Sequence, residues 1–371
     1  MLTRRGFAAR LGAAATMGRM LPEMAFAQRA AVQGDLPQDM VWLNANENPA
    51  GPPRSSIQAM IEVLPTAGRY HYQEFRDFYE KLAHTEDVTR EQILIGAGSS
   101  EVLHAAVDAF TSATRPLIAI NPTYEGPVEL ARALGRPVAR VPLTDSFSAD
   151  VHKLVEEAEK AKGGLIYLCN PNNPTSSITT RDDVAWLVKN LPRNTLVLID
   201  EAYIHFGEIP ELESALGYVR QEKDVIVTRT FSKIYGMAGL RAGFACARGD
   251  LIAQMAPFRN NVISIVTARA VLAALRESNT LIPERKAALV KTRRSLCEWL
   301  RERQVRYLEP QANFVMIDVG RDVGEFLHTM PRLGVAPGRR FSPLDQMLRV
   351  SIGTDQDMEK FKEVFWKVYQ G

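Results

Sequence analysis

The feature that most constrains the fold of this chain is a regular alternation of short apolar runs and helical patterns between residues 93 and 250. The segments between the runs repeat apolar residues at helical spacing, as in Glu101–Phe110. Near-continuous apolar strands that alternate with helices predict an α/β fold with a mostly parallel central sheet and helices on both faces. The expected strands are Ile93–Ile95, Leu117–Ile120, Val138–Val141, Leu165–Cys169, Leu196–Ile199, Val225–Thr228 and Gly243–Ala247.

The pattern changes after residue 260. A long helical pattern covers Glu284–Arg303, and a strand-like run follows at Asn313–Val319. A short helix, a second strand at Leu348–Ile352 and a terminal helix at Asp357–Tyr369 come next. This order predicts a smaller α+β domain. The expected regions are a leader (1–27), an N-terminal segment that packs with the small domain (28–65), a large domain (66–265) and a small C-terminal domain (266–371).

The first 27 residues have the layout of an export signal. Two arginines precede a weakly hydrophobic stretch and a small-x-small triplet, which are Arg4-Arg5, Leu11–Met17 and Ala25-Phe26-Ala27. The order resembles a twin-arginine signal peptide, so we expect a periplasmic or exported protein whose mature chain begins near Gln28. Arg10 and Arg19 interrupt the apolar stretch and favour the alternative, an amphipathic helix retained on a cytoplasmic protein.

Composition excludes several classes of partner. The formal net charge is +2, and removal of residues 1–27 would leave 41 basic and 42 acidic side chains, so no basic footprint for nucleic acid is present. No apolar run approaches the ~18–20 residues that span a bilayer, so we expect no membrane-spanning body. The three cysteines are scattered and the six histidines show no paired spacing, so neither a disulfide framework nor a metal site is expected.

Polar residues cluster in five short segments that follow one another at compatible separations. The segments are Leu43-Asn44-Ala45-Asn46-Glu47-Asn48-Pro49, Gly96-Ala97-Gly98-Ser99-Ser100-Glu101, Asn170-Pro171-Asn172-Asn173-Pro174-Thr175, Asp200-Glu201-Ala202-Tyr203, and Thr230-Phe231-Ser232-Lys233 with Gly239-Leu240-Arg241. Together they resemble the fold-type I pyridoxal-phosphate (PLP) aminotransferases of class I and II, and most of all the histidinol-phosphate aminotransferase family. The likeness runs from about residue 40 to residue 371.

Lys233 and Asp200 are the expected catalytic centre. Lys233 follows a strand in a loop rich in Ser, Thr and Gly, where its amine can form an imine with the cofactor aldehyde and later move the substrate's α-proton. Asp200 ends an apolar run, and an ionised carboxylate there would keep the pyridine nitrogen protonated. Glu201 could compete for this role, but strand alternation sends the two side chains to opposite faces, and the resemblance selects Asp200.

The resemblance implies roles for the residues around the cofactor ring. Asn173 and Tyr203 look like the pair that hydrogen-bonds its phenolic oxygen, and Tyr124 corresponds to the aromatic that stacks on it. The chain departs from the family at Ser176, where a glycine is usual, so the turn there is expected to differ.

The cofactor phosphate requires a cradle of donors. Gly98-Ser99-Ser100 opens a predicted helix, and a helix N-terminus favours an anion. Thr230, Ser232 and Arg241 supply further donors, and Arg241 adds a full charge. Tyr70 matches a family tyrosine that reaches the phosphate of the neighbouring subunit, although His71 stands where the family often has proline. This role implies a homodimer.

The substrate end is expected at Arg349, which resembles the family arginine that receives the substrate's anionic group. Asn313 is expected to assist, and Asn46 is the third expected substrate-binding residue. Arg339 and Arg340 lie nearby in sequence, where either one could bind a distal anion or both could be a solvated basic pair.

The function expected from these features is transamination. In a ping-pong cycle the enzyme takes an amino group from an amino acid or a histidinol-phosphate-like amine and passes it to a 2-oxo acid. A PLP-dependent lyase or decarboxylase on the same scaffold is the alternative, and a non-catalytic PLP-binding regulator is a remote one. Export would sit badly with histidine synthesis, so the amino donor stays open.

Overall fold

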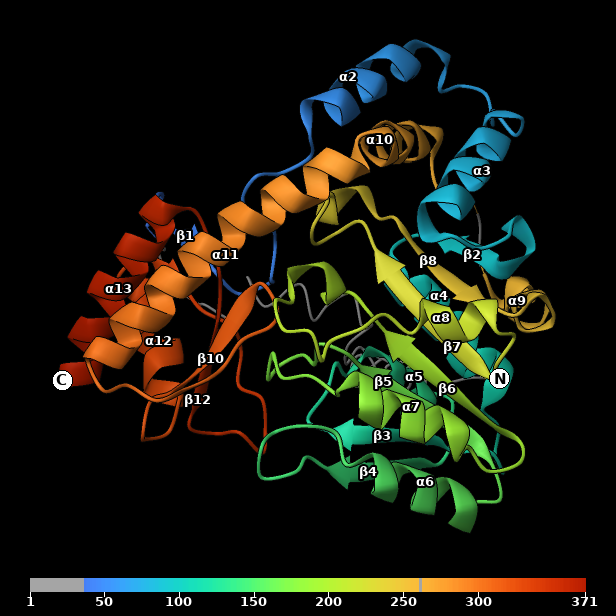
Figure 1. Ribbon diagram of the computed structural model, residues 1–371. Helices are drawn as coiled ribbons and strands as arrows, with labels where there is room; N and C mark the ends of the chain where they lie inside the picture. The colour runs from blue at the N-terminus through green and yellow to red at the C-terminus, as the bar shows by residue number, and fades with distance from the viewer. Residues whose placement is uncertain (1–36, 260–261) are drawn as a thin grey trace, which may run out of the picture.

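The computed structural model describes residues 37–259 and 262–371, so the expected leader lies outside the described residues. The centre of the fold is a seven-stranded sheet in the order β2-β8-β7-β6-β5-β3-β4 (Figure 1). Only β8 runs antiparallel to its neighbours, which confirms the predicted mostly parallel sheet. The strands are β2 (Ile93–Gly96), β3 (Leu117–Asn121), β4 (Val138–Pro142), β5 (Gly164–Cys169), β6 (Thr195–Asp200), β7 (Val225–Thr230) and β8 (Gly243–Ala247).

Helices cover both faces of this sheet. Figure 1 shows α7 and α8 on the near face and α4 and α5 behind it. The central strands are almost fully buried because both of their faces are covered, which explains their continuous apolar sequences. The helices are α4 (Ser99–Phe110), α5 (Gly126–Ala133), α6 (Val151–Lys160), α7 (Arg181–Lys189), α8 (Leu216–Arg220) and α9 (Gly249–Met255).

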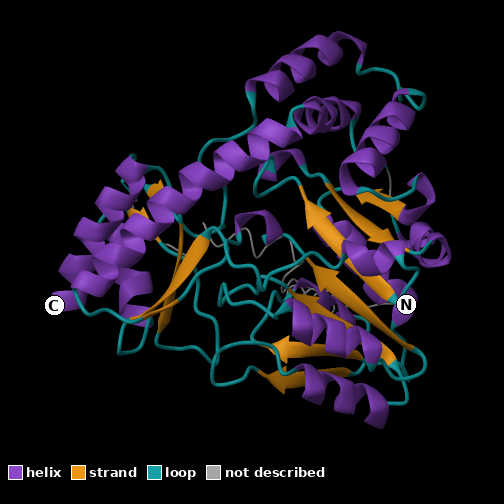
Figure 2. Cartoon of the chain, in the orientation of Figure 1, coloured by secondary structure: helices purple, strands orange, loops and turns teal. Residues whose placement is uncertain are grey.

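A second, smaller region is built on an antiparallel sheet in the order β12-β10-β9. The terminal helix and the long helix α11 pack together beside it (Figure 2). The elements are α11 (Ser278–Glu302), β9 (Tyr307–Leu308), β10 (Phe314–Asp318), α12 (Gly324–Arg332), β11 (Val335–Ala336), β12 (Met347–Ser351) and α13 (Asp355–Gln370).

The N-terminal segment divides between the two regions. Strand β1 (Val41–Trp42) pairs in parallel with β11 of the small region. Helix α2 (Arg54–Val63) instead lies against α10 (Ile265–Arg276), as does α3 (Glu74–Glu86). Residue 266, where the sequence suggested that the small domain begins, therefore lies in a helix that packs with α2 and α3. The long helix α11 makes the crossing from there to the small sheet (Figure 1).

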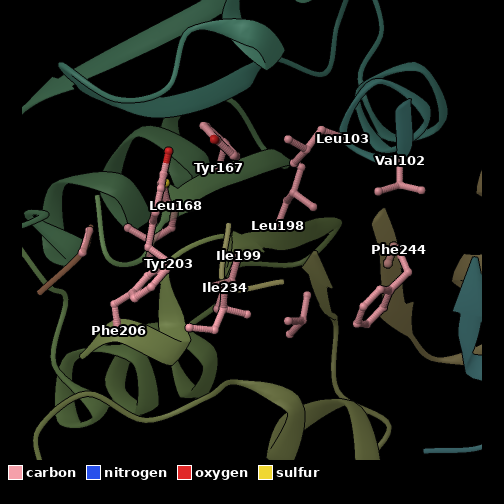
Figure 3. Close-up of a cluster of buried hydrophobic side chains, with 14 of the residues drawn as sticks. Val102, Leu103, Tyr167, Leu168, Leu198, Ile199, Tyr203, Phe206, Ile234 and Phe244 are labelled. Carbon is pink, nitrogen blue, oxygen red and sulfur yellow. The ribbon is translucent and has the colours of Figure 1, made fainter. Parts of the chain in front are cut away.

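The hydrophobic core fixes the edge of the large sheet at which polar residues gather. Leu168, Leu198 and Ile199 gather with Tyr203 and Ile234 in one cluster in Figure 3, and all five are buried. Parallel strands end at one edge, so the residues that follow β5, β6 and β7 come together there. The N-terminal loop between β1 and α2 and strands β10 and β12 of the small region reach the same edge.

Candidate active site

Asp200 is a buried carboxylate whose hydrogen-bond donors are all neutral. It is the last residue of β6 and is 3% exposed. Its oxygens accept from the Tyr167 hydroxyl at 3.3 Å, the Thr228 hydroxyl at 3.2 Å and the Ala202 amide at 3.2 Å. Within residues 37–259 and 262–371 it has no ion pair, and burial raises its pKa to about 6. The site is therefore suited to a buried cationic group.

Glu201, the adjacent carboxylate, points to the opposite side of the sheet. One oxygen accepts from Arg229 Nη2 at 2.8 Å, and the same guanidinium also pairs with Glu86 at 2.5 Å. The other oxygen accepts from the Ala215 amide at 2.6 Å. The alternation expected from the sequence is thus present, and Glu201 has a structural partner that Asp200 lacks.

Lys233 lies in the loop after β7, close to the N-terminal segment. Its Nζ donates to the Ala45 carbonyl at 3.0 Å and lies 5.7 Å from the centre of the Tyr203 ring. Burial and the nearby charge of Arg349 lower its pKa to about 8. A substantial fraction of the amine is therefore neutral near physiological pH, the form that attacks a carbonyl or accepts a proton.

Tyr203 joins the segments that meet at this edge. Its hydroxyl accepts from Asn46 Nδ2 at 3.2 Å and from Asn173 Nδ2 at 3.4 Å, and burial raises its pKa. Asn46 also bonds Ser351 through its backbone amide and its side-chain oxygen. The Asn46 side chain therefore serves to place Tyr203, a contact that its expected substrate-binding role did not anticipate.

A cradle lies at the N-terminus of α4. Gly98 has a φ of 81°, and a Cβ there would lie 2.2 Å from Arg241 Nη2, so only glycine allows this guanidinium against the start of the helix. A Cβ at Gly243 would lie 2.2 Å from the Ser99 amide, so the two segments touch. This cradle combines backbone N–H groups, a helix N-terminus and one cation, as a phosphate requires.

The other expected donors border this cradle. The Thr230 hydroxyl donates to Ser232 Oγ at 2.9 Å, and Ser232 donates its amide back to Thr230 Oγ1 at 3.1 Å. Ser100 Oγ lies 3.5 Å from the Tyr124 hydroxyl, and burial raises the pKa of Tyr124. Apart from Tyr70, the expected ring and phosphate residues of the large region thus lie at one edge of the sheet.

Arg349 on β12 is a buried cation and the counterpart of Asp200. It donates to Asn173 Oδ1 at 2.7 Å and to the Asn44 carbonyl at 2.5 Å, and lies 4.6 Å from the centre of the Phe341 ring. Among the described residues it has no carboxylate partner, its Nε has no acceptor, and burial lowers its pKa to about 10. A buried guanidinium in this state is suited to an anion.

Asn313 lies between the small region and the N-terminal loop. Its Nδ2 donates to the Asn46 carbonyl at 2.9 Å, while its Oδ1 is buried and has no donor among the residues that the structure describes. The side chain therefore holds the N-terminal loop and still offers a free acceptor beside the Arg349 strand.

Arg339 borders this centre, whereas Arg340 and Tyr70 stand apart from it. Arg340 is half-buried and pairs with Asp322 and Asp345. Arg339 lies 4.3 Å from the centre of the Phe341 ring, on a cavity of about 390 Å³ that Arg132 and Arg140 also line. Tyr70 is 73% exposed and does not reach the cradle of its own chain.

The sequence analysis missed two of the three donors to Asp200. Tyr167 lies inside β5, where it reads as one more apolar residue of a buried strand. Thr228 pairs directly with Asp200 in the β6–β7 ladder. A register between neighbouring strands would have found Thr228, because it lies at the end of the expected strand next to the one that Asp200 follows.

The arrangement fits pyridoxal 5′-phosphate at every point that can be compared. An uncompensated buried carboxylate suits the pyridinium nitrogen, a partly neutral lysine suits the aldehyde, and the cradle at Gly98 and Arg241 suits the phosphate. A mostly parallel sheet with these groups at its carboxyl edge defines a fold-type I PLP enzyme.

Comparison with known proteins makes the assignment specific. Residues 38–365 match the family model "Aminotransferase class I and II". The chain belongs to this family, and pyridoxal 5′-phosphate is its cofactor. A histidinol-phosphate aminotransferase from Symbiobacterium thermophilum is 32% identical over 88% of this chain and 89% of its own length. An aromatic amino acid aminotransferase from Cutibacterium acnes is 31% identical over 90% and 94%.

A solved structure agrees in fold. The histidinol-phosphate aminotransferase from Sinorhizobium meliloti, in complex with pyridoxal-5′-phosphate, superposes with a TM-score of 0.84 over 95% of both chains at 24% identity. The family match and the two relatives show that the chain is a PLP-dependent aminotransferase, as its sequence predicted. None of the helices in the described part of the chain combines the length and apolar character that a membrane span requires.

Proposed function

We propose that this enzyme transfers the amino group of a donor that carries an anionic group to a 2-oxo acid, with Asp200, Lys233 and Arg349 in the central roles. The single observation that carries the proposal is a pair of buried, uncompensated charges. Asp200 has only neutral donors, and Arg349 has only neutral acceptors, among the described residues. Leaving either charge unpaired in the interior is costly, so each is expected to have a ligand group as its partner.

The cofactor end is proposed to be fixed by the large region. When bound, PLP supplies an electron sink that stabilises negative charge at the substrate's reacting carbon. Asp200 would hold the pyridine nitrogen in its protonated form, Asn173 and Tyr203 would hydrogen-bond the phenolic oxygen, and Tyr124 would pack against the ring. The phosphate would be held by Gly98, Ser99, Ser100, Thr230, Ser232 and Arg241.

Lys233 is proposed to carry the proton. Among the described residues its Nζ donates a hydrogen bond only to the Ala45 carbonyl, a neutral acceptor that the amine can leave at little cost. With a pKa of about 8, the released amine can accept a proton from the substrate's reacting carbon and donate it again later in the amino transfer. This assignment requires one lysine to be both the cofactor's anchor and the proton carrier.

Arg349 is proposed to read the substrate's anion, a carboxylate or a phosphate, because a guanidinium can pair with either through two parallel hydrogen bonds. Asn313 assists, and Asn46 supports the site by placing Tyr203. The two named relatives act on amines of different shape, so the identity of the donor is left to a substrate panel. Amino acids and histidinol phosphate both satisfy the anion requirement.

The test is a separation of the two half-reactions. Incubation of the holoenzyme with single amine donors should give one equivalent of carbonyl product per site, and turnover should begin only when 2-oxoglutarate or pyruvate is added. Continued product formation without any 2-oxo acid would show lyase or decarboxylase chemistry instead.

A homodimer with Tyr70 reaching the partner's cofactor phosphate is part of the proposal. Helix α2 and the residues that follow it expose five large apolar side chains within residues 57–72, which are Ile57, Ile61, Leu64, Tyr70 and Tyr72. Tyr70 and Tyr72 stack with ring centres 5.3 Å apart. Sedimentation should show a dimer, and Tyr70→Phe should weaken PLP binding by roughly tenfold through loss of one charge-assisted hydrogen bond. A monomer with unchanged PLP affinity would contradict this.

Export through the twin-arginine route is also proposed. The expected mature protein begins near Gln28, and Arg4→Lys with Arg5→Lys should retain it in the cytoplasm. N-terminal sequencing of protein from cell fractions provides the test. An uncleaved cytoplasmic chain that is destabilised by deletion of residues 1–27 would overturn export and remove the objection to a histidine-biosynthetic role.

A further inference from the structure

Ser176 occupies a position at which its backbone favours glycine. It lies in the loop after β5, three residues beyond Asn173, and has a φ of 61°. L-residues rarely adopt this conformation, since the left-handed region costs roughly 1 kcal/mol or more without glycine. The Ser176 side chain is fully buried, so its hydroxyl has to find hydrogen-bond partners within the protein and not in solvent.

The Ser176 hydroxyl accepts hydrogen bonds from two backbone amides of the small region. Its Oγ lies 2.8 Å from the Ala312 nitrogen and 3.1 Å from the Gln311 nitrogen, and the Ser176 carbonyl also accepts from Gln311 at 2.9 Å. Ala312 is buried, and Ser176 Oγ is the only acceptor found for its amide in the part of the chain that the structure describes. A glycine or alanine at 176 would leave this amide without a partner.

These two amides immediately precede the residues proposed to bind substrate. Asn313 follows Ala312 directly, and β10 then pairs with β12, where Met316 lies opposite Arg349. The same loop that carries Ser176 contacts Arg349 through Asn173. The loop after β5 therefore holds the small region at two points, one on the Arg349 side chain and one on the backbone at the start of β10.

We infer that Ser176 is a positioning residue. Its hydroxyl fixes the backbone just before β10, and this places Asn313 and Arg349 at the proper distance from the cofactor-binding edge of the large sheet. The inference rests on the proposed role of Arg349. In this arrangement Ser176 contacts neither cofactor nor substrate, and it acts through the backbone of residues 311 and 312. Loss of the hydroxyl should weaken binding of the anionic group and leave the proton-transfer machinery of Lys233 intact.

Two substitutions separate the hydroxyl from the backbone conformation. Ser176→Gly and Ser176→Ala both remove Oγ, but only glycine relieves the left-handed strain. Ser177→Ala is the matched control, because the Ser177 hydroxyl lies in the same loop and donates to Phe147 rather than to the small region. The probe is succinate, an unreactive dicarboxylate, whose dissociation constant from the holoenzyme is measured together with KM and kcat.

Both Ser176 variants should raise the Kd of succinate and the KM of the donor by ~10-fold, with kcat at saturation nearly unchanged, because binding geometry and not chemistry is disturbed. Amide hydrogen exchange in a peptide covering residues 309–313 should accelerate in both variants. Ser176→Gly should melt at a higher temperature than Ser176→Ala. Ser177→Ala should match the parent in exchange and in succinate affinity.

The inference is overturned if Ser176→Gly binds succinate like the parent, or if exchange at residues 309–313 is unaffected. Arg349→Gln distinguishes this failure from failure of the proposed function. If Arg349→Gln loses succinate affinity while Ser176→Gly does not, only the positioning role falls. If Arg349→Gln keeps full affinity, the anion site itself is wrong, and the role of Ser176 falls with it.

Discussion

In the part of the chain that the structure describes, Asp200 and Arg349 are both buried charges without an opposite charge beside them, but the protein holds them in different ways. Asp200 belongs to a seven-stranded sheet, and two of its three donors come from the neighbouring strands β5 and β7. Arg349 belongs to the small region, and its acceptors, Asn173 and Asn44, come from the large region and the N-terminal loop. The cofactor end is therefore fixed within one sheet, whereas the substrate end depends on contacts between regions.

The largest effect is expected at the centre that both ends share. Lys233→Ala should lower kcat by roughly 10³-fold or more, because it removes both the covalent anchor and the proton carrier. In the parent enzyme, borohydride should attach the cofactor irreversibly to Lys233, as peptide mapping would show. The exposed Lys223→Ala serves as control. A label on any other lysine would show that Lys233 is not the cofactor's anchor.

The rigid end should reveal itself in the stability of the cofactor-free protein. Burial raises the Asp200 pKa from 3.8 to about 6, so the folded state holds a proton that the unfolded state releases between these values. The free energy of unfolding should therefore fall as pH rises from about 4 through 6, by about 3 kcal/mol attributable to this group. Urea unfolding of the cofactor-free parent and Asp200→Asn across this range provides the measurement. If the two pH profiles run parallel, Asp200 is not an uncompensated charge.

Asp200→Asn tests the same residue with the cofactor bound. A neutral amide cannot pair with the pyridinium, so kcat should fall roughly 30- to 100-fold, the size expected for one strong charge-assisted hydrogen bond. Glu201→Gln is the matched control, and it should lower stability through the buried Arg229 contact. If Asp200→Asn has normal activity while a folded Glu201→Gln is inactive, the carboxylate that pairs with the pyridinium is Glu201 and not Asp200.

The smallest effect is expected at the end held by inter-region contacts. Arg349→Gln should raise the KM for anionic donors roughly tenfold and leave cofactor affinity close to that of the parent, because the contacts of Asp200 within the large sheet remain. Arg332→Gln is the control, since this exposed arginine of the small region bonds only the His328 carbonyl among the described residues. A loss of cofactor affinity in Arg349→Gln as large as in Asp200→Asn would show that the two ends are not independent.

The same division explains what the sequence could predict. All seven strands of the large sheet were expected, and most of them are continuously apolar because they are buried on both faces. Helix α3 was missed because its 13 residues are largely charged and polar. Helix α2 was missed because Ile57 and Ile61 are exposed, so its apolar residues do not mark one buried face. Strands β1 and β11 have two residues each, too few for any period.

The candidate site divides in the same way. Lys233 and Asp200 follow strands that the sequence reveals, so they were found together with their surroundings. The bond from Asn46 to the Tyr203 hydroxyl spans 157 positions and depends on how the N-terminal loop crosses the sheet edge, which no local pattern encodes. The Ser176 contacts with Gln311 and Ala312 were missed for the same reason, although the departure from glycine marked the position.

The buried Glu86–Arg229–Glu201 cluster favours one register of β6 against β7. Two carboxylates stand in succession at the end of this strand, and a slip of one residue against β7 would move Glu201 to the place of Asp200 and away from Arg229. Arg229 would then stay buried with Glu86 as its remaining carboxylate partner, which is costly. A mispaired chain is thus penalised even without the cofactor, so the cluster favours the register that places Asp200 in the site.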